Sequence, residues 1–135
     1  MTTLHPQIPD PSSTILLVED ELVIRMNVAD YLVDRGFLVV EASNATEALG
    51  YLTSSVVEID LVFTDVRMPG KMDGLALARW IQQHRVGLPV IVTSGDVGRE
   101  NVSTKTFPAD FFFPKPYELN TIAEAIVKLT QPVAA

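Results

Sequence analysis

The sequence predicts an α/β fold in which helices cover both faces of a doubly wound, five-stranded parallel sheet. Short apolar runs alternate along the chain with segments of helical periodicity, and this alternation is typical of a parallel sheet. The runs are apolar at consecutive positions, as in strands that are buried on both faces. Right-handed crossovers between parallel strands then leave a doubly wound sheet as the simplest architecture.

The first part of the chain contains two strand–helix pairs. Thr14–Val18 is an apolar strand that runs into acidic residues, and Leu22–Arg35 carries apolar residues at helical spacing until Gly36 ends the helix. Phe37–Val40 is again apolar and is predicted to be a strand. Asn44–Leu52 has the pattern of a helix, and its first residue is a suitable N-cap.

The second part repeats the alternation. Asp60–Thr64 is predicted to be a buried strand, and a turn rich in proline and glycine leads from it to a helix over Leu75–His84. Leu88–Thr93 is the next strand. Phe111–Phe113 is a short fifth strand, and Tyr117–Thr130 has the apolar stripe of a closing helix.

These elements indicate one domain over residues 14–130, with a proline-containing tail over 1–13 and a short tail over 131–135. Segment 95–109 has glycines and β-branched residues that weaken helix propensity, so at best a short, mobile helix is expected there. After Thr130 too few residues remain for an output module. Met1 and the short tail favour a stand-alone protein.

Composition excludes several classes of function. The formal net charge is −7, from 10 basic and 17 acidic residues, and the sequence has no run of Lys or Arg, which argues against a nucleic-acid partner. The absence of cysteine excludes disulfides and thiolate zinc sites. No apolar run is long enough to span a membrane, so no membrane partner and a cytoplasmic location are expected.

Polar residues follow the predicted strands. Glu19 and Asp20 come after the first strand, Asp65 after the third, Ser94 after the fourth, and the fifth leads into Lys115. In open parallel sheets, ligands bind beyond the carboxyl ends of the strands. We therefore expect three carboxylates, a hydroxyl and an ammonium group to converge on one edge of the sheet.

This set of groups suits phosphoryl transfer. Clustered carboxylates repel one another unless a cation is present, and hard oxygen ligands suit Mg²⁺ or Mn²⁺. A carboxylate can act as the nucleophile toward a phosphoryl group. Lys115 could neutralise the phosphoryl oxygens and Ser94 could donate a hydrogen bond to them.

Four stretches of the sequence resemble the signature blocks of response-regulator receiver domains in two-component signalling. They are Ile15–Glu21, Phe63–Gly70, Val92–Gly95 and Phe113–Pro116, and the resemblance runs from about Thr14 to Thr130. It implies a stand-alone receiver similar to the chemotaxis regulators, with the flavodoxin-like strand order 2-1-3-4-5.

The resemblance also implies residue roles at the site. Asp65 is the expected phospho-acceptor, and Lys115 is the matching lysine, whose bond to the following proline is usually cis in this family. Asp20, the Asp65 carboxylate and the backbone carbonyl of Arg67 would hold the metal, with Glu19 acting mainly through water.

Further positions match the residues that switch the domain and tune its chemistry. Ser94 takes the place of the switch hydroxyl, and Phe112 that of the switch aromatic. Arg67 and Asp96 occupy the two positions that usually tune loss of the phosphoryl group. Their opposite charges suggest that the side chains pair over the site and hinder the attacking water.

The predicted function is a switch, not an enzyme in its own right, that catalyses only its own phosphorylation and dephosphorylation. A histidine kinase or phosphotransfer protein, as in a phosphorelay, would donate to Asp65, and the face formed by 95–130 would change its affinity for a downstream protein. Alternatives are a receiver-like interaction module that is never phosphorylated and an aspartyl-phosphate phosphatase, although such phosphatases typically have aspartate where Arg67 stands. A nucleotide or flavin binder is less well supported, because no glycine-rich loop follows the first strand.

Overall fold

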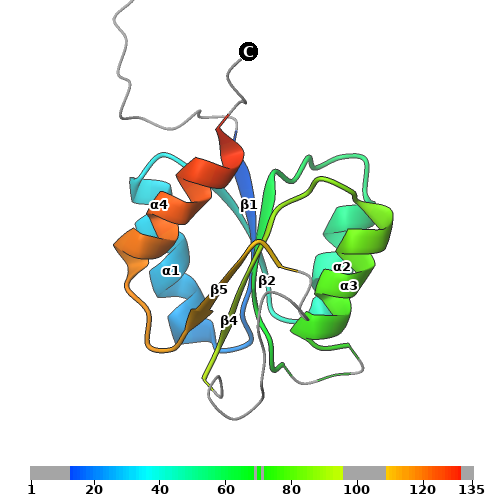
Figure 1. Cartoon of the computed structure of the whole chain (residues 1–135), viewed down its shortest axis with the longest axis horizontal. Coiled ribbons are helices and arrows are strands. Elements are labelled where there is room, and N and C mark those ends of the chain that lie inside the picture. The colour runs from blue at the N-terminus through cyan, green and yellow to red at the C-terminus, as the bar shows by residue number, and fades with distance from the viewer. Residues whose placement is uncertain (1–12, 69, 71, 96–108, 132–135) are drawn as a thin grey trace, which may run out of the picture.

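The computed structural model describes residues 13–68, 70, 72–95 and 109–131. Within these residues, five strands form one parallel sheet in the order β2-β1-β3-β4-β5, which confirms the predicted strand order. The helices cover both faces of this sheet (Figure 1). The elements are β1 (Thr14–Val18), α1 (Leu22–Asp34), β2 (Leu38–Ala42), α2 (Ala45–Thr53), β3 (Leu61–Asp65), α3 (Gly74–His84), β4 (Val90–Ser94), β5 (Phe111–Pro114) and α4 (Leu119–Thr130).

The core consists of two apolar layers, one on each face of the sheet. Helices α1 and α4 lie on one face, and α2 and α3 lie on the other (Figure 1). Alternate residues of β1 supply the two layers: Ile15 and Leu17 pack toward α1 and α4, whereas Leu16 and Val18 pack toward α2 and α3. All residues of β1, β3 and β4 are buried, as the continuous apolar runs predicted.

Strand β2 departs from the sequence prediction. The predicted strand Phe37–Val40 was wrong at both ends, because the strand begins at Leu38 and continues to Ala42. Phe37 is buried in the core before the strand starts, while Leu38 is 53% exposed. Since β2 lies at the edge of the sheet, only part of it is buried, and its pattern is not the uniformly apolar one expected of a central strand.

Two helices begin at side-chain caps that set their direction from the sheet. Asn44 caps α2, as predicted, by accepting a hydrogen bond from the backbone N–H of Glu47 at 2.7 Å. The Glu47 carboxylate in turn accepts from the backbone N–H of Ser43, the residue before the cap, at 2.6 Å. Asp73 caps α3 through the N–H of Ala76 at 2.9 Å, so this helix starts directly after the turn that follows β3.

Most of segment 95–109, for which weak helix propensity was predicted, lies outside the described residues, as do nearly all of the predicted tails. No helix in the described part of the chain combines the length and the apolar character needed to cross a membrane.

Candidate functional site

The register of the sheet brings the polar strand ends to one edge. Val18 at the end of β1 pairs with Thr64 of β3, and Asp65 pairs with Thr93 of β4. Ser94 pairs with Pro114 of β5, directly before Lys115. Residues that are far apart in the sequence are therefore neighbours at the carboxyl edge, because all five strands point the same way.

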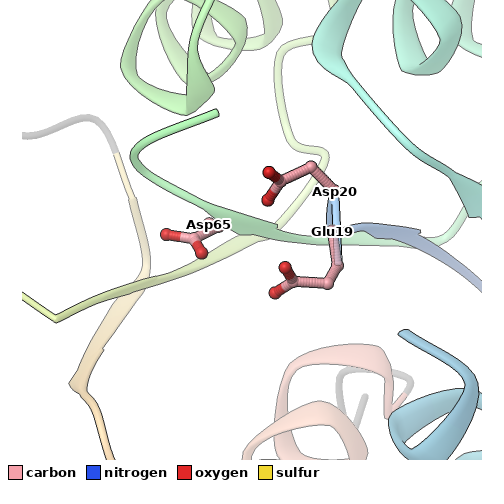
Figure 2. Close-up of side chains that lie close together, drawn as sticks. All are labelled: Glu19, Asp20 and Asp65. Atoms are coloured by element: carbon pink, nitrogen blue, oxygen red, sulfur yellow. The ribbon is translucent and has the colours of Figure 1, made fainter. Parts of the chain in front are cut away.

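Three carboxylates gather at this edge (Figure 2). One oxygen of each of Glu19, Asp20 and Asp65 lies within 4.8 Å of the others. Glu19 and Asp65 are buried, whereas Asp20 is exposed. The donor set fits a hard divalent cation such as Mg²⁺, which binds through one or two carboxylates and keeps several waters on its open side. The exposed Asp20 leaves such an open side.

Lys115 lies beside the two buried acids, Asp65 and Glu19. Its Nζ is 2.6 Å from Asp65 Oδ2 and 3.9 Å from Glu19 Oε1. Burial lowers the pKa of Lys115, but the hydrogen bond and charge of Asp65 and the charge of Glu19 raise it, and the net change is a rise. The ammonium group therefore stays charged at neutral pH and offsets part of the negative charge of the cluster.

The backbone around Asp65 is held from several directions. Its Oδ1 accepts a hydrogen bond from the N–H of Arg67 at 3.3 Å, and its carbonyl accepts one from the Thr64 hydroxyl at 3.0 Å. The N–H of Gly74 donates to the Val66 carbonyl at 2.8 Å. A Cβ atom at Gly74 would collide with the backbone carbonyl of Asp65, so only glycine fits where α3 approaches the site.

The remaining predicted residues differ in how closely the structure connects them with the cluster. Ser94 is buried at the end of β4, and its carbonyl accepts the backbone N–H of Lys115 at 3.0 Å. Phe112 is partly buried and packs on the layer that faces α2 and α3. Arg67 is exposed beside Asp65, and Asp96 lies outside the residues that the structure describes.

Tyr117 is a residue of the site that the sequence interpretation assigned only to the start of a helix. It contributes, with Glu19, Asp65 and Thr93, to the lining of a cavity large enough for about one water molecule. Its ring packs edge-on against Phe63, with 5.8 Å between centroids. Burial, followed by the negative charge of Glu19, raises the pKa of Tyr117. The sequence signal that could have placed Tyr117 at the site was its position two residues after Lys115.

The buried position of Glu19 leads to a pH-dependent prediction. Burial raises its pKa, and this effect exceeds the lowering by the backbone N–H of Glu21 and by Lys115. The stabilisation linked to such a raised pKa is complete below the unfolded value of 4.5 and is lost as the pH rises through the folded value. In EDTA, Glu19→Gln should therefore be more stable than wild type at pH 7, with the difference vanishing toward pH 4.5.

Urea denaturation between pH 4.5 and pH 8 measures this difference. Saturating Mg²⁺ should reverse the order, because a bound cation stabilises the wild-type carboxylate. Glu124→Gln is the matched control, since Glu124 lies on the exposed face of α4 and its substitution removes the same charge. A Glu19→Gln variant that is less stable than wild type throughout the pH range in EDTA would contradict the interpretation.

Comparison with known proteins agrees with the fold and identifies the family. The family model described as "Response regulator receiver domain" matches residues 15–127. The sensor kinase CckA of Brucella abortus is 36% identical over 123 residues, which are 89% of this chain and 13% of that protein. This chain spans 13% of the length of that relative and 54% of the length of a second curated relative that it matches.

Solved structures give the same result. The response regulator receiver domain protein from Clostridium thermocellum is 30% identical, with a TM-score of 0.78 over 87% of this chain and 94% of that one. The response regulator protein TrrA of Thermotoga maritima, solved in complex with Mg(2+)-BeF, is 28% identical, with a TM-score of 0.77 over 87% of this chain and 98% of that one. The chain belongs to the response-regulator receiver domain family and is homologous to phosphorylatable response regulators.

Proposed function

We propose that this receiver accepts a phosphoryl group on Asp65 from a histidine kinase or a phosphotransfer protein, and that the loaded form binds a downstream partner with altered affinity. The observation that carries the proposal is that the Asp65 carboxylate lies close to two further acids and 2.6 Å from the Nζ of Lys115. This arrangement places a carboxylate nucleophile beside the positive charge of Lys115 at the edge of the sheet.

The acidic side chains hold the divalent ion in this proposal. Asp20, the Asp65 carboxylate and the backbone carbonyl of Arg67 are its ligands, and Glu19 acts mainly through water. A bound Mg²⁺ or Mn²⁺ would neutralise negative charge on the phosphoryl oxygens. The closeness of the three carboxylates and the exposure of Asp20 support this assignment.

The transfer forms one bond and breaks one. An oxygen of the Asp65 carboxylate attacks the phosphorus atom, and the P–N bond to the donor histidine breaks, with its electron pair remaining on the imidazole nitrogen. Lys115 offers its positive charge to a phosphoryl oxygen, and Ser94 offers its hydroxyl. The domain thus catalyses its own loading, and later its own hydrolysis, through positioning and charge.

Ser94 and Phe112 form the proposed link to the partner. Ser94 ends β4, and Phe112 lies on the neighbouring strand opposite Val92. Movement of the Ser94 hydroxyl toward the phosphoryl group would open space between β4 and β5, and the Phe112 ring would move into that space. A shift in partner affinity requires only a few kcal/mol of differential binding between the two states. The face formed by 95–130 would be the surface whose affinity for the partner changes. Arg67 and Asp96 would set how long the phosphoryl group stays on Asp65.

The start of α1 supports a protein as donor. Leu22, Val23 and Met26 lie in the first part of α1, shortly after Asp20, and are 56%, 69% and 49% exposed. A protein that brings a histidine to Asp65 would come close to this end of α1, and contact there would remove these apolar side chains from water. A small-molecule donor would leave them exposed.

The alternatives raised by the sequence are not favoured. A match to the receiver family over residues 15–127 supports a switch rather than a phosphatase, and Arg67 stands where such a phosphatase typically has a second aspartate. The acids and Lys115 that phosphorylation requires are present together, which argues against a receiver that is never phosphorylated.

Intact mass spectrometry after incubation with Mg²⁺ and acetyl phosphate tests the proposal. Wild type is expected to gain the mass of one phosphoryl group, whereas Asp65→Asn should gain none, because an amide is not a competent nucleophile. EDTA should abolish the gain in wild type. Asp34→Asn at the end of α1 is the matched control and should be phosphorylated like wild type. Equal mass gain in Asp65→Asn and wild type would refute the assignment of the acceptor.

A further inference from the structure

Arg25 connects helix α1 with the loop that carries two of the three acids. Its Nη1 donates a hydrogen bond to the backbone carbonyl of Glu19 at 2.8 Å. Its Nε donates to Oε1 of Glu41, on strand β2, at 3.1 Å. The Arg25 side chain is only 15% exposed, so the guanidinium lies against the molecule and does not extend into solvent.

The backbone of Glu19 is therefore fixed on both sides. Its N–H donates to the Ala42 carbonyl at the end of β2 at 3.0 Å. Its carbonyl is tied to the same strand through Arg25 and Glu41. The carbonyl of Glu19 shares a rigid peptide plane with the N–H and Cα of Asp20. Holding that oxygen consequently fixes the direction in which the chain leaves toward Asp20.

The contribution of the Arg25–Glu41 ion pair to the stability of the fold does not by itself explain this arrangement. Glu41 is 43% exposed, and ion pairs of this kind contribute little to the free energy of unfolding. A positive charge close to a cation site also repels the cation. If charge were the whole effect of Arg25, its removal would tighten cation binding. A positioning effect has the opposite sign, because partners that orient ligands affect affinity by about 10- to 100-fold.

We propose that Arg25 is a positioning residue of the acidic site. Its guanidinium bridges the Glu19 carbonyl and the Glu41 carboxylate, and this bridge directs the Asp20 carboxylate toward Glu19 and Asp65. The proposal rests on the function proposed above, since it concerns the same site. It adds a bridge from the edge strand β2 to the metal ligands, made by a side chain that itself touches neither the cation nor the phosphoryl group.

Mn²⁺ titration of the full chain, followed by electron paramagnetic resonance, tests this bridge without any phosphorylation step. Arg25→Gln is expected to bind Mn²⁺ about 10-fold more weakly than wild type, because the Glu19–Asp20 peptide loses its anchor. Arg25→Lys should recover part of the loss, since an ammonium group keeps the charge but cannot match the two contacts of the guanidinium. Glu41→Ala should also weaken binding, because it removes the partner on β2 that holds the Arg25 guanidinium.

Arg35→Gln is the matched control. Arg35 follows the other end of α1 and donates to the Tyr31 hydroxyl at 2.7 Å, so this variant loses the same charge far from the site. Thermal unfolding in EDTA should show all four variants folded, with midpoints close to wild type. Binding by Arg25→Gln that is as tight as, or tighter than, binding by Arg35→Gln would overturn the proposal. A wild-type chain that binds no Mn²⁺ would instead overturn the metal assignment itself.

Discussion

Replacement of Gly74 by alanine is expected to lower the free energy of unfolding by about 3 kcal/mol, the upper part of the range for overpacked sites. The added Cβ would overlap the backbone carbonyl of Asp65, and main-chain atoms cannot rotate away as a side chain can. Either α3 or the end of β3 must move. Urea denaturation measures the loss, and slower phosphorylation by acetyl phosphate would show that Asp65 has been displaced.

Gly50→Ala is the matched control for this substitution. Gly50 lies within α2, and a Cβ there would have no neighbouring atom within 4 Å. Alanine should stabilise the chain by about 0.5 to 1 kcal/mol through its higher helix propensity. If Gly74→Ala unfolded at the same urea concentration as wild type, the close contact between α3 and the acceptor strand would be ruled out.

Asp20→Asn is expected to reduce Mg²⁺ affinity by more than about 10-fold, because even residues that merely orient metal ligands have effects of this size. Asp20 is exposed, so the variant should fold, and loss of its charge relieves repulsion with Glu19 and Asp65 in the metal-free state. The variant should therefore be at least as stable as wild type in EDTA. Isothermal titration with Mg²⁺ and thermal unfolding in EDTA measure the two effects separately.

Asp34→Asn provides the comparison of equal net charge, since Asp34 lies at the opposite end of α1 from the site. It should bind Mg²⁺ like wild type. Equal affinities of the Asp20 and Asp34 variants would mean that the acidic cluster acts only through the overall charge of the protein.

The central elements could be predicted from the sequence because burial alone determines their pattern. In β1, β3 and β4 every residue is buried, so each strand contains an apolar run of three or four consecutive residues. The polar residues at the ends of these runs predicted which side chains meet, since parallel strands deliver their carboxyl ends to one edge. The prediction for β2 was less accurate, because an edge strand tolerates the exposed Leu38 and the charged Glu41.

The supporting residues of the site could not be predicted in the same way. Arg25 and Glu41 are 16 positions apart and meet only because α1 packs beside β2. Gly74 appears in the sequence as part of an ordinary turn, and its requirement for glycine arises from how closely α3 approaches Asp65. Such constraints depend on the path of the chain in space, which periodicity and propensity do not determine.

Strand β5 alternates its aromatic rings between the two apolar layers, with Phe112 on one side and Phe111 and Phe113 on the other. Deleting a single residue between Phe111 and Lys115 would invert this alternation and withdraw the ammonium group from Asp65. The spacing from Phe111 to Lys115 therefore fixes both the packing of these rings and the position of the ammonium group at the acceptor.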